Sequence, residues 1–335
     1  MNLIIITKKF GNNYTGATIA TQNLIRNWIL FFENIEVFCI DLGNYQKFSN
    51  LKVHHCKNQK EMINNIRRIK DCNTIFYSDD HLGYILDREG KKYYHTYHGN
   101  WPDARKINFD FYIKSFYFIH MYKKTISGAT NVINVSDYMS KFTNKYNTKC
   151  VTIRNGIRRN KQLQNNDCIK NSKKCMLIGN IDNRKYKKAI PVLKKVFSID
   201  KEIVFDIYGN IDNNNLAKKL LKIGNVNLNG YVKDIPYQNY NVMICTSIIE
   251  NLPLSICECL VNDVPVISFN VGGISEVVKD KVNGFLVDKF DISEMSEIII
   301  DFFRKNKKMR NINLDDFDWE KSSKKYLNLF MGDII

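Results

Sequence analysis

The stretch CTSIIENLPLSICE, residues 245–258, decides the fold class and locates a candidate site. An apolar run ends at Cys245, a polar loop follows, and Pro253 stands where the first residue of a helix is expected. Three further segments follow in order, VPVI (264–267), VGGISEVV (271–278) and NGFLV (283–287). Apolar strands that alternate with loops and helices predict a parallel sheet covered on both faces.

The same alternation extends along the whole chain. Strands are predicted at 3–7, 36–40, 74–78, 93–97, 131–135, 151–154, 175–179, 203–208, 242–245, 264–269 and 284–287. Helices are predicted at 17–32, 186–197, 214–223, 253–261, 292–303 and 319–330. The polar segment 156–173 lacks apolar periodicity and indicates a linker.

We therefore expect an α/β protein of two similar domains with a cleft between them. The predicted first domain is 1–156, and a linker follows at 157–173. The predicted second domain is 174–318, and a last helix at 319–335 is expected to pack back on the first domain.

Composition narrows the class of protein. The 335 residues are 44% hydrophobic and 25% charged, which excludes global disorder. No apolar run approaches the roughly 20 residues of a spanning helix, and no secretory leader is visible, so a cytoplasmic protein is expected. The nine cysteines are scattered without a Cys-x-x-Cys motif, which favours free thiols over a zinc site.

The positive charge is concentrated in the first half. Residues 1–160 carry 24 Lys/Arg and 12 Asp/Glu, whereas residues 161–335 carry 26 and 22, so +12 of the net +16 lies in the first half. Residues 105–124 combine five Lys/Arg with eight aromatic rings, His120 included. Such a segment favours an anionic membrane surface. The alternatives are a solvated basic surface and a core-packing helix with basic ends.

The stretch 245–258 can hold a phosphate and sugar hydroxyls. The backbone N–H groups at the helix start, near Asn251, Leu252, Pro253 and Leu254, can receive an anion. Glu258, inside the helix, can accept two hydrogen bonds from a vicinal diol such as a ribose. Glu250, in the loop, can accept from a sugar hydroxyl. The alternative is a surface glutamate and a salt-bridged helical one.

Taken with the segments around it, the stretch resembles the donor-binding half of glycosyltransferase family 4, retaining enzymes of the GT-B fold. Two glutamates eight apart, Val-Pro-Val, Gly-Gly-x-x-Glu and Asn-Gly-x-Leu-Val stand in the family's order. GYV (230–232) is similar to the family's Gly-x-Val strand, which implies that Val232 lies near the nucleotide base. The resemblance implies two Rossmann-like domains with parallel sheets facing a central cleft.

The resemblance extends more weakly into the first half. YHGN (97–100) is similar to the family's His-Gly loop, which implies that His98 approaches the donor sugar. Gly16 and Ala17 occupy the place of the family's glycine pair near the diphosphate.

One stretch departs from the family pattern. MLIGNIDNRK (176–185) matches the stretch that usually carries an arginine and a lysine against the diphosphate. Lys185 stands at the lysine, Asn180 replaces the arginine, and Arg184 is the candidate to compensate. A weakly active accessory subunit is the alternative.

The resemblance implies transfer of a hexose-type sugar from a nucleotide sugar, expected to be a UDP-sugar, with retained anomeric configuration. Lys185, Arg184, the helix start and the Gly16 loop would stabilise the leaving diphosphate, Glu258 would hold the ribose, and Glu250 and His98 the sugar. Because fixed cations and dipoles suffice, no metal or other cofactor is expected. A glycan or lipid-linked acceptor of a bacterial-type surface polysaccharide is expected, at the inner membrane face.

Other classes of function remain as alternatives. A nucleotide-sugar epimerase of the same fold is the rival enzyme. A nucleic-acid partner is not expected, because no recognised nucleic-acid module appears. A nicotinamide dehydrogenase is disfavoured, because no Gly-x-Gly-x-x-Gly follows the first strand.

Overall fold

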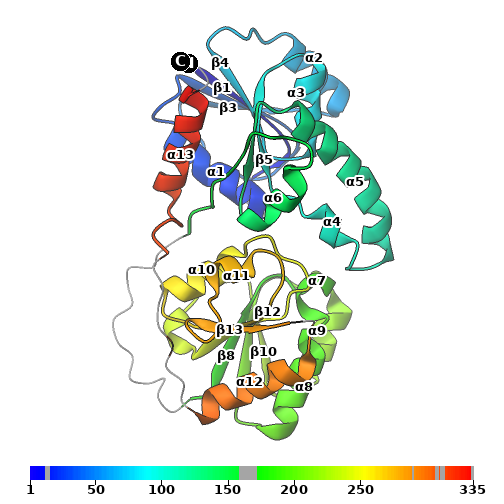
Figure 1. Ribbon diagram of the computed structural model, residues 1–335, viewed down its shortest axis with the longest axis vertical. Coiled ribbons are helices and arrows are strands. Elements are labelled where there is room, and N and C mark those ends of the chain that lie inside the picture. Colours follow the sequence, from blue (N-terminus) through cyan, green and yellow to red (C-terminus); the bar gives the residue numbers. More distant parts are fainter. Residues whose placement is uncertain (12–15, 158–171, 289, 306–308, 310–313, 333–335) are drawn as a thin grey trace. The chain divides into compact units, whose positions relative to one another are not determined.

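The computed structural model describes residues 1–11, 16–157, 172–288, 290–305, 309 and 314–332 (Figure 1). The chain divides into two compact units: unit 1 is Met1–Gly156 with Asp315–Ile335, and unit 2 is Ile157–Leu314. Residues 158–171 of the predicted linker and residues 12–15, which precede Gly16, lie outside the described residues. None of the described helices is long and apolar enough to cross a membrane.

Unit 1 is built on a seven-stranded parallel sheet, in the order β3-β2-β1-β4-β5-β6-β7. Its strands are β1 (Asn2–Phe10), β2 (Asn34–Leu42), β3 (Leu51–His55), β4 (Thr74–Ser78), β5 (Tyr93–Tyr97), β6 (Asn131–Asn134) and β7 (Cys150–Thr152). Its helices are α1 (Gly16–Trp28), α2 (Gln59–Arg67), the 3₁₀ turn η1 (His81–Gly83), α3 (Tyr84–Arg88), α4 (Trp101–Ala104), α5 (Phe109–Gly128), α6 (Asp137–Thr143) and α13 (Trp319–Gly332).

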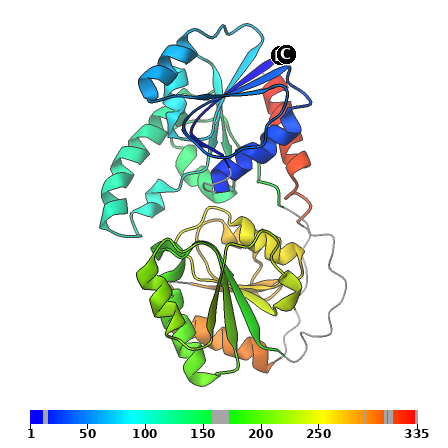
Figure 2. The same ribbon diagram turned by 180° about the vertical axis from the view of Figure 1, so that it is seen from behind.

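The interior strand β1 contributes side chains to two hydrophobic cores, because successive side chains of a strand point to opposite faces. Leu3 and Ile5 pack with residues of α1 and α13 on one face. Ile4 and Ile6 pack with residues of α2, α3 and α5 on the other. Figure 2 shows the strands and their covering helices from behind.

The last helix, α13, contributes to the core of unit 1. The ring of Tyr326 lies 5.5 Å from that of Trp28 on α1, and its hydroxyl lies 2.9 Å from Thr96 Oγ1 of β5. Phe330 is also buried against Trp28, with 5.5 Å between the ring centroids. The chain therefore returns to unit 1 after passing through unit 2.

Unit 2 is built on a six-stranded parallel sheet, in the order β10-β9-β8-β11-β12-β13. Its strands are β8 (Lys174–Ile178), β9 (Val204–Tyr208), β10 (Val226–Gly230), β11 (Val242–Cys245), β12 (Val266–Phe269) and β13 (Gly284–Val287). Its helices are α7 (Asn183–Tyr186), α8 (Ala189–Ile199), α9 (Asn214–Leu221), the 3₁₀ turn η3 (Tyr237–Asn239), α10 (Leu254–Val261), α11 (Ile274–Val277) and α12 (Ile292–Arg304).

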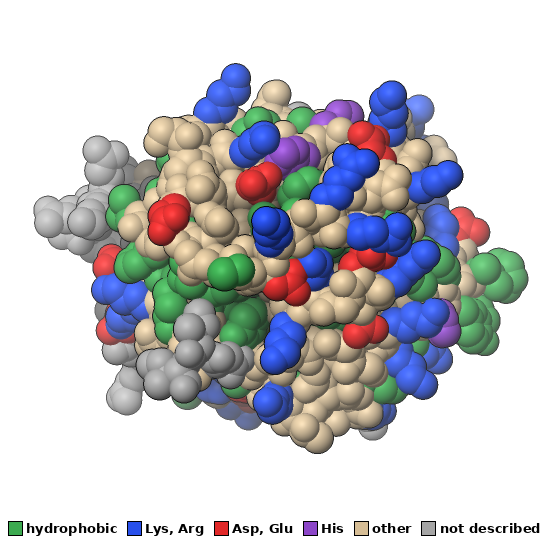
Figure 3. All heavy atoms as spheres, turned by 90° about the horizontal axis from the view of Figure 1, so that it is seen from above, with side chains coloured by type: hydrophobic (Ala, Val, Ile, Leu, Met, Phe, Trp, Pro, Cys, Tyr) green, Lys and Arg blue, Asp and Glu red, His purple; other side chains and the backbone are tan. Residues whose placement is uncertain are grey.

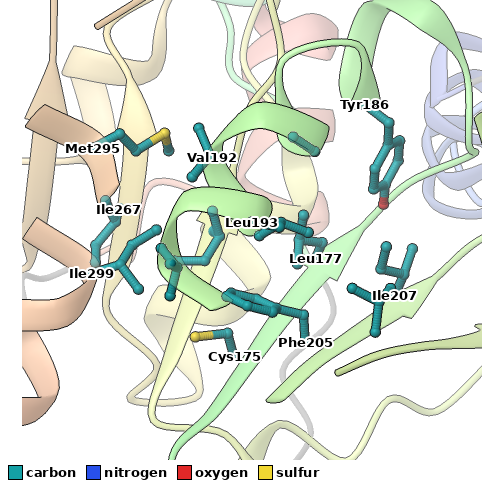
Figure 4. Packing of buried hydrophobic residues seen from close by; sticks show 14 of the residues in the cluster. Cys175, Leu177, Tyr186, Val192, Leu193, Phe205, Ile207, Ile267, Met295 and Ile299 are labelled. Carbon is teal, nitrogen blue, oxygen red and sulfur yellow. The ribbon is translucent and has the colours of Figure 1, made fainter. Parts of the chain in front are cut away.

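One core of unit 2 lies between its sheet and the helices α8 and α12. Met295 and Ile299 of α12 lie beside Val192 and Leu193 of α8 (Figure 4). The spacing of four residues between Met295 and Ile299 places both on the helix face that is turned to the sheet. This packing fixes the strands whose carboxyl ends carry the candidate site.

The structure corrects three expected helices. The helix predicted at 17–32 ends at Trp28, where the side-chain amide of Asn50 donates to the carbonyls of Ile29 and Phe32. The helix predicted at 186–197 is two helices, α7 and α8. Pro253 precedes the first helical residue, with extended backbone at the N-cap of α10.

Candidate functional site

The candidate site lies where the strand order of unit 2 reverses. From β8 the chain proceeds outward through β9 and β10, and then returns to the other side of β8 with β11. Ligands of such sheets bind outside the carboxyl ends of the strands at this switch point. The segment after β8 carries Lys185, and the segment after β11 carries Glu250, so two predicted residues share this edge.

The structure places Lys185 and Glu250 in direct contact. Lys185 Nζ lies 3.3 Å from Glu250 Oε1, and the Ser247 hydroxyl donates to the same oxygen at 2.8 Å. Burial is the largest single effect and lowers the pKa of Lys185, but the charge of Glu250, the nearby Cys245 and a hydrogen bond to Glu250 together raise it by more, so the pKa lies above its usual value. Lys185 is therefore a fixed cation at neutral pH.

Hydrogen bonds to backbone carbonyls hold the loop after β11 against α7. The Thr246 hydroxyl donates to the carbonyl of Lys185 at 2.6 Å, and the Ile248 N–H donates to the carbonyl of Arg184 at 2.9 Å. These two bonds tie the segment just before Glu250 to the backbone of Arg184 and Lys185. These loop bonds hold the Lys185–Glu250 pair in place. The Glu250 carboxylate is also positioned by the Ser247 hydroxyl and not by Lys185 alone.

Two glycines are required by this geometry. Gly179 has φ +135°, and a Cβ there would lie 2.5 Å from the Lys185 Cδ, because the lysine side chain crosses over it. Gly272, the first glycine of the Gly-Gly pair, has φ +61°, and a Cβ there would lie 1.6 Å from the carbonyl oxygen of Glu250. The next residue, Gly273, donates its N–H to the carbonyl of Asn251 at 2.8 Å. The Gly-Gly turn therefore packs against the backbone of Glu250 and Asn251 and holds this loop in place.

Arg184 and Asn180 make contacts of their own. The Arg184 guanidinium binds the Asp182 carboxylate through two nitrogens, at 2.6 and 2.9 Å. Asn180 donates to Asp212 Oδ2 at 3.0 Å and accepts from the Asn210 N–H at 3.2 Å. Asn180 thus bonds the loop after β9, and Arg184 already has an anionic partner.

The start of α10 offers backbone donors. In the part of the chain that the structure describes, the N–H groups of Leu254 and Ser255 donate to no protein acceptor, whereas that of Ile256 donates to Pro253. Leu252 and Pro253 are buried and hold the helix start in place. Free N–H groups at a helix start are the usual partners of a phosphate.

Glu258 lies one turn into α10 and is half-buried. The hydroxyl of Tyr237 donates to Glu258 Oε2 at 3.2 Å. Burial and the charge of Glu258 raise the pKa of Tyr237, so this hydroxyl keeps its proton and remains a donor. Val232, predicted near the base, lies in the loop after β10 and is half-exposed.

The other predicted residues belong to unit 1. Gly16 is the first residue of α1, and Ala17 follows it. His98 directly follows β5, and its burial lowers the pKa to about 4, so the imidazole is neutral at pH 7. Gly16, Ala17 and His98 follow the carboxyl ends of strands in the sheet of unit 1. Unit 2 carries the other predicted residues, Lys185, Glu250, Asn251 and Glu258.

Sequence reasoning missed four residues that shape the site of unit 2: Gly179, Asp182, Tyr237 and Ser247. Ser247 had a signal, since it lies three residues before Glu250 in the loop. Asp182 stands two residues before Arg184 and caps α7, which is a typical helix-start pattern. Tyr237 and Gly179 gave no local signal, because their roles depend on contacts across the sheet. Among the described residues, no group of three or more His, Cys, Asp or Glu could hold a metal ion.

The second half of the chain matches a known family. Residues 160–314 match the model of the family "Glycosyl transferases group 1". A poly(ribitol-phosphate) alpha-N-acetylglucosaminyltransferase of Staphylococcus aureus (strain COL) is 24% identical over 172 residues, which are 46% of this chain. The matched part spans 35% of that enzyme, so this chain covers about a third of its length.

Solved structures resemble the whole chain. WaaG, a glycosyltransferase involved in lipopolysaccharide biosynthesis, is similar with a TM-score of 0.75 and 11% identity, over 97% of this chain and 95% of WaaG. Anabaena HepE in complex with UDP and glucose is similar with a TM-score of 0.72 and 13% identity, over 99% and 98%. The chain has the GT-B fold of two Rossmann-like domains, and the predicted fold class is confirmed.

Proposed function

We propose that the protein is a retaining glycosyltransferase that moves a hexose-type sugar from a UDP-sugar to a hydroxyl group of a glycan or lipid-linked acceptor. The observation that carries the proposal is the Lys185–Glu250 pair beside the open start of α10. It lies at the switch point of a unit that matches group 1 glycosyl transferases.

The chemistry follows from where charge develops. When the bond from the sugar to the diphosphate breaks, the electron pair goes to the diphosphate oxygen. The Lys185 ammonium and the N–H groups of Leu254 and Ser255 would stabilise that charge. The new bond forms to the acceptor oxygen, and the acceptor proton leaves with the diphosphate.

The neighbouring side chains would orient the donor. Glu258, steadied by the Tyr237 hydroxyl, would accept hydrogen bonds from the ribose diol. Glu250 and the neutral His98 would contact the transferred sugar, and Gly16 and Ala17 would approach the diphosphate. Val232 would lie beside the base. Because fixed cations and dipoles supply the charge, we propose that the reaction needs neither a metal nor another cofactor.

The identity of donor and acceptor draws on similar proteins. HepE has been crystallised with UDP and with UDP-glucose, which supports a UDP-sugar donor. The staphylococcal relative is an alpha-N-acetylglucosaminyltransferase of a poly(ribitol phosphate), and WaaG takes part in lipopolysaccharide synthesis. These names support an acceptor in surface polysaccharide synthesis, and we propose that the protein meets it on the cytoplasmic face of the membrane.

A donor panel tests the proposal. The full chain is heated with UDP, UDP-glucose, UDP-N-acetylglucosamine, GDP-mannose or NAD, and a ligand at 100 times its dissociation constant should stabilise it by roughly 2.7 kcal/mol. UDP and one UDP-sugar should raise the melting temperature, NAD should not, and EDTA should leave the shift unchanged. A UDP-sugar converted to its epimer without an acceptor would identify an epimerase instead. No stabilisation by any nucleotide would contradict the proposal.

A further inference from the structure

Helix α5 exposes a continuous apolar face. Five of its large hydrophobic side chains are between 43% and 75% exposed: Phe109, Tyr112, Ile113, Phe116 and Tyr117. We call these five residues the α5 face. Their spacing of three, one, three and one residues places them on one side of the helix over its first two turns.

The opposite side of α5 is the side that packs. Ser115, Met121, Tyr122, Thr125 and Ile126 are buried there. The Phe118 ring stacks on Trp101 of α4 with 3.9 Å between the centroids, and lies 5.0 Å from the imidazole of His81. Core packing therefore accounts for one side of this segment. At the edge of the α5 face the Tyr117 ring lies 6.3 Å from that of His81, yet its side chain is still 51% exposed, so core packing does not explain why this face is apolar.

Positive charge surrounds the α5 face. Residues 105–124 contain five Lys/Arg and one acidic residue, Asp110. The exposed Lys123 and Lys124 continue the same side of the helix, each about two turns after Phe116 and Tyr117 respectively. Figure 3 shows hydrophobic side chains that protrude over α5 at the right-hand edge, with Lys and Arg side chains beside them.

Some of these cations already have partners. Lys106 pairs with Asp103 at 2.6 Å, and Lys123 lies 5.4 Å from the ring centre of Tyr146. Both contacts are at the surface, so the ammonium groups can still meet an outside anion.

We propose that the α5 face docks on an anionic membrane surface. The aromatic rings and Ile113 would enter the boundary between headgroups and acyl chains, and the lysines at the C-terminal end of the face would meet lipid phosphates. The inference rests on α5 alone and does not depend on the proposed sugar transfer.

A lipid surface fits this face better than a protein partner does. Nine residues of helix span about 12 Å. Five half-exposed side chains supply roughly 500 Å², given that a large aromatic residue buries about 150–250 Å² when fully covered. A stable protein interface needs about 800 Å² on each side. A convex ridge with flanking lysines needs no complementary groove when the partner is a bilayer.

Vesicle sedimentation of the full chain tests the proposal. The wild type should bind phosphatidylcholine vesicles that contain one third phosphatidylglycerol at least tenfold more tightly than pure phosphatidylcholine vesicles, and high salt should release it. The double variant Ile113→Glu with Phe116→Glu should bind the anionic vesicles at least tenfold more weakly. Lys123→Glu with Lys124→Glu should weaken it through charge alone.

Leu30→Glu is the matched control, since Leu30 is 85% exposed on unit 1 outside α5, and this variant should bind like the wild type. Affinity for UDP, measured on every variant, reports on the fold and on the proposed donor site, and should not change. Absence of vesicle binding, or an equal loss in the Leu30 variant, would overturn the proposal. A wild-type dimer that Ile113→Glu dissociates, without any vesicle binding, would assign the face to a second copy instead.

Discussion

Lys185 Nζ lies 3.3 Å from Glu250 Oε1, although 64 residues of chain separate the two positions. Both residues follow strands that are neighbours in the sheet of unit 2, so the sheet order brings them together. The carboxylate is also held by Ser247, and the ammonium crosses Gly179. This arrangement provides a positioned cation and a hydrogen-bond acceptor on one rigid edge, as the binding of a sugar diphosphate requires.

Replacing Arg184 should have a small effect. Its guanidinium is bound to the Asp182 carboxylate, so the pair contributes little net charge to a donor diphosphate. We expect Arg184→Ala to lower turnover less than tenfold, whereas Lys185→Ala should lower it by roughly 10²–10³. Steady-state rates of both variants check this. Equal losses would mean that Arg184 leaves Asp182 and compensates for Asn180.

Removing the Glu258 carboxylate should weaken nucleotide binding. Hydrogen bonds to a charged group contribute about 1.5–3 kcal/mol, so Glu258→Ala should lose that much of the affinity for UDP. Tyr237→Phe removes only the neutral donor and should lose about 0.5–1.5 kcal/mol. Calorimetric titration of UDP measures both. A folded Glu258 variant with unchanged affinity would remove Glu258 from the site.

The strands that are buried on both faces were predictable from sequence. Predicted and observed bounds agree for β4, β5, β11 and β13, because each is a short apolar or aromatic run between polar residues. Strand β3 was missed: it is the half-exposed edge strand LKVHH, and its charged and imidazole side chains hide the alternation. Helix α2 was missed for the same kind of reason, since only Met62 and Ile66 of its nine residues are buried.

The candidate site was predictable as a set of residues but not as contacts. The helix start at Pro253 and the two glutamates are local signals. The ion pair of Lys185 with Glu250 and the bond from Tyr237 to Glu258 depend on strand order, which no local pattern reveals. The φ values of Gly179 and Gly272 are set by close approach of other segments, and are equally invisible in the sequence.

A methyl group at Gly272 should destabilise unit 2 more than backbone strain alone. Gly272→Ala would place Cβ 1.6 Å from the Glu250 carbonyl oxygen, so the loop must move. Gly230→Ala is the control, because Gly230 has a similar φ of +68° with nothing within 4 Å of the added Cβ. A positive φ costs of order 1–2 kcal/mol, and Gly272→Ala should exceed that. Urea unfolding of both variants measures the loss of unfolding free energy. Equal losses in the two variants would show that the Glu250 loop moves aside without cost.

The buried Asp79 should make stability depend on pH. It follows β4 in unit 1 and accepts a hydrogen bond from the Thr21 hydroxyl. Burial and the neighbouring charge of Asp80 raise its pKa to about 7. Because the folded state favours the protonated form, the free energy of unfolding should fall as pH rises from about 4 to about 7.

Asp79→Asn should remove this dependence. The variant cannot ionise, and its amide oxygen can still accept from Thr21. Its unfolding free energy should exceed that of the wild type at pH 8 by about 4 kcal/mol at most, and the two should converge near pH 4. Urea unfolding at the two pH values measures the difference. A variant that is less stable at pH 8 would show that the ionised carboxylate is stabilised by contacts.

Calorimetric titration of UDP into the wild type and into Lys185→Ala tests the donor site most directly. The ammonium makes a charge-assisted contact with the diphosphate in this account, so the variant should bind UDP at least tenfold more weakly. Lys187→Ala, an exposed lysine two residues further on, is the control and should bind like the wild type. A wild type that does not bind UDP, or a folded Lys185 variant that binds it equally well, would contradict the account.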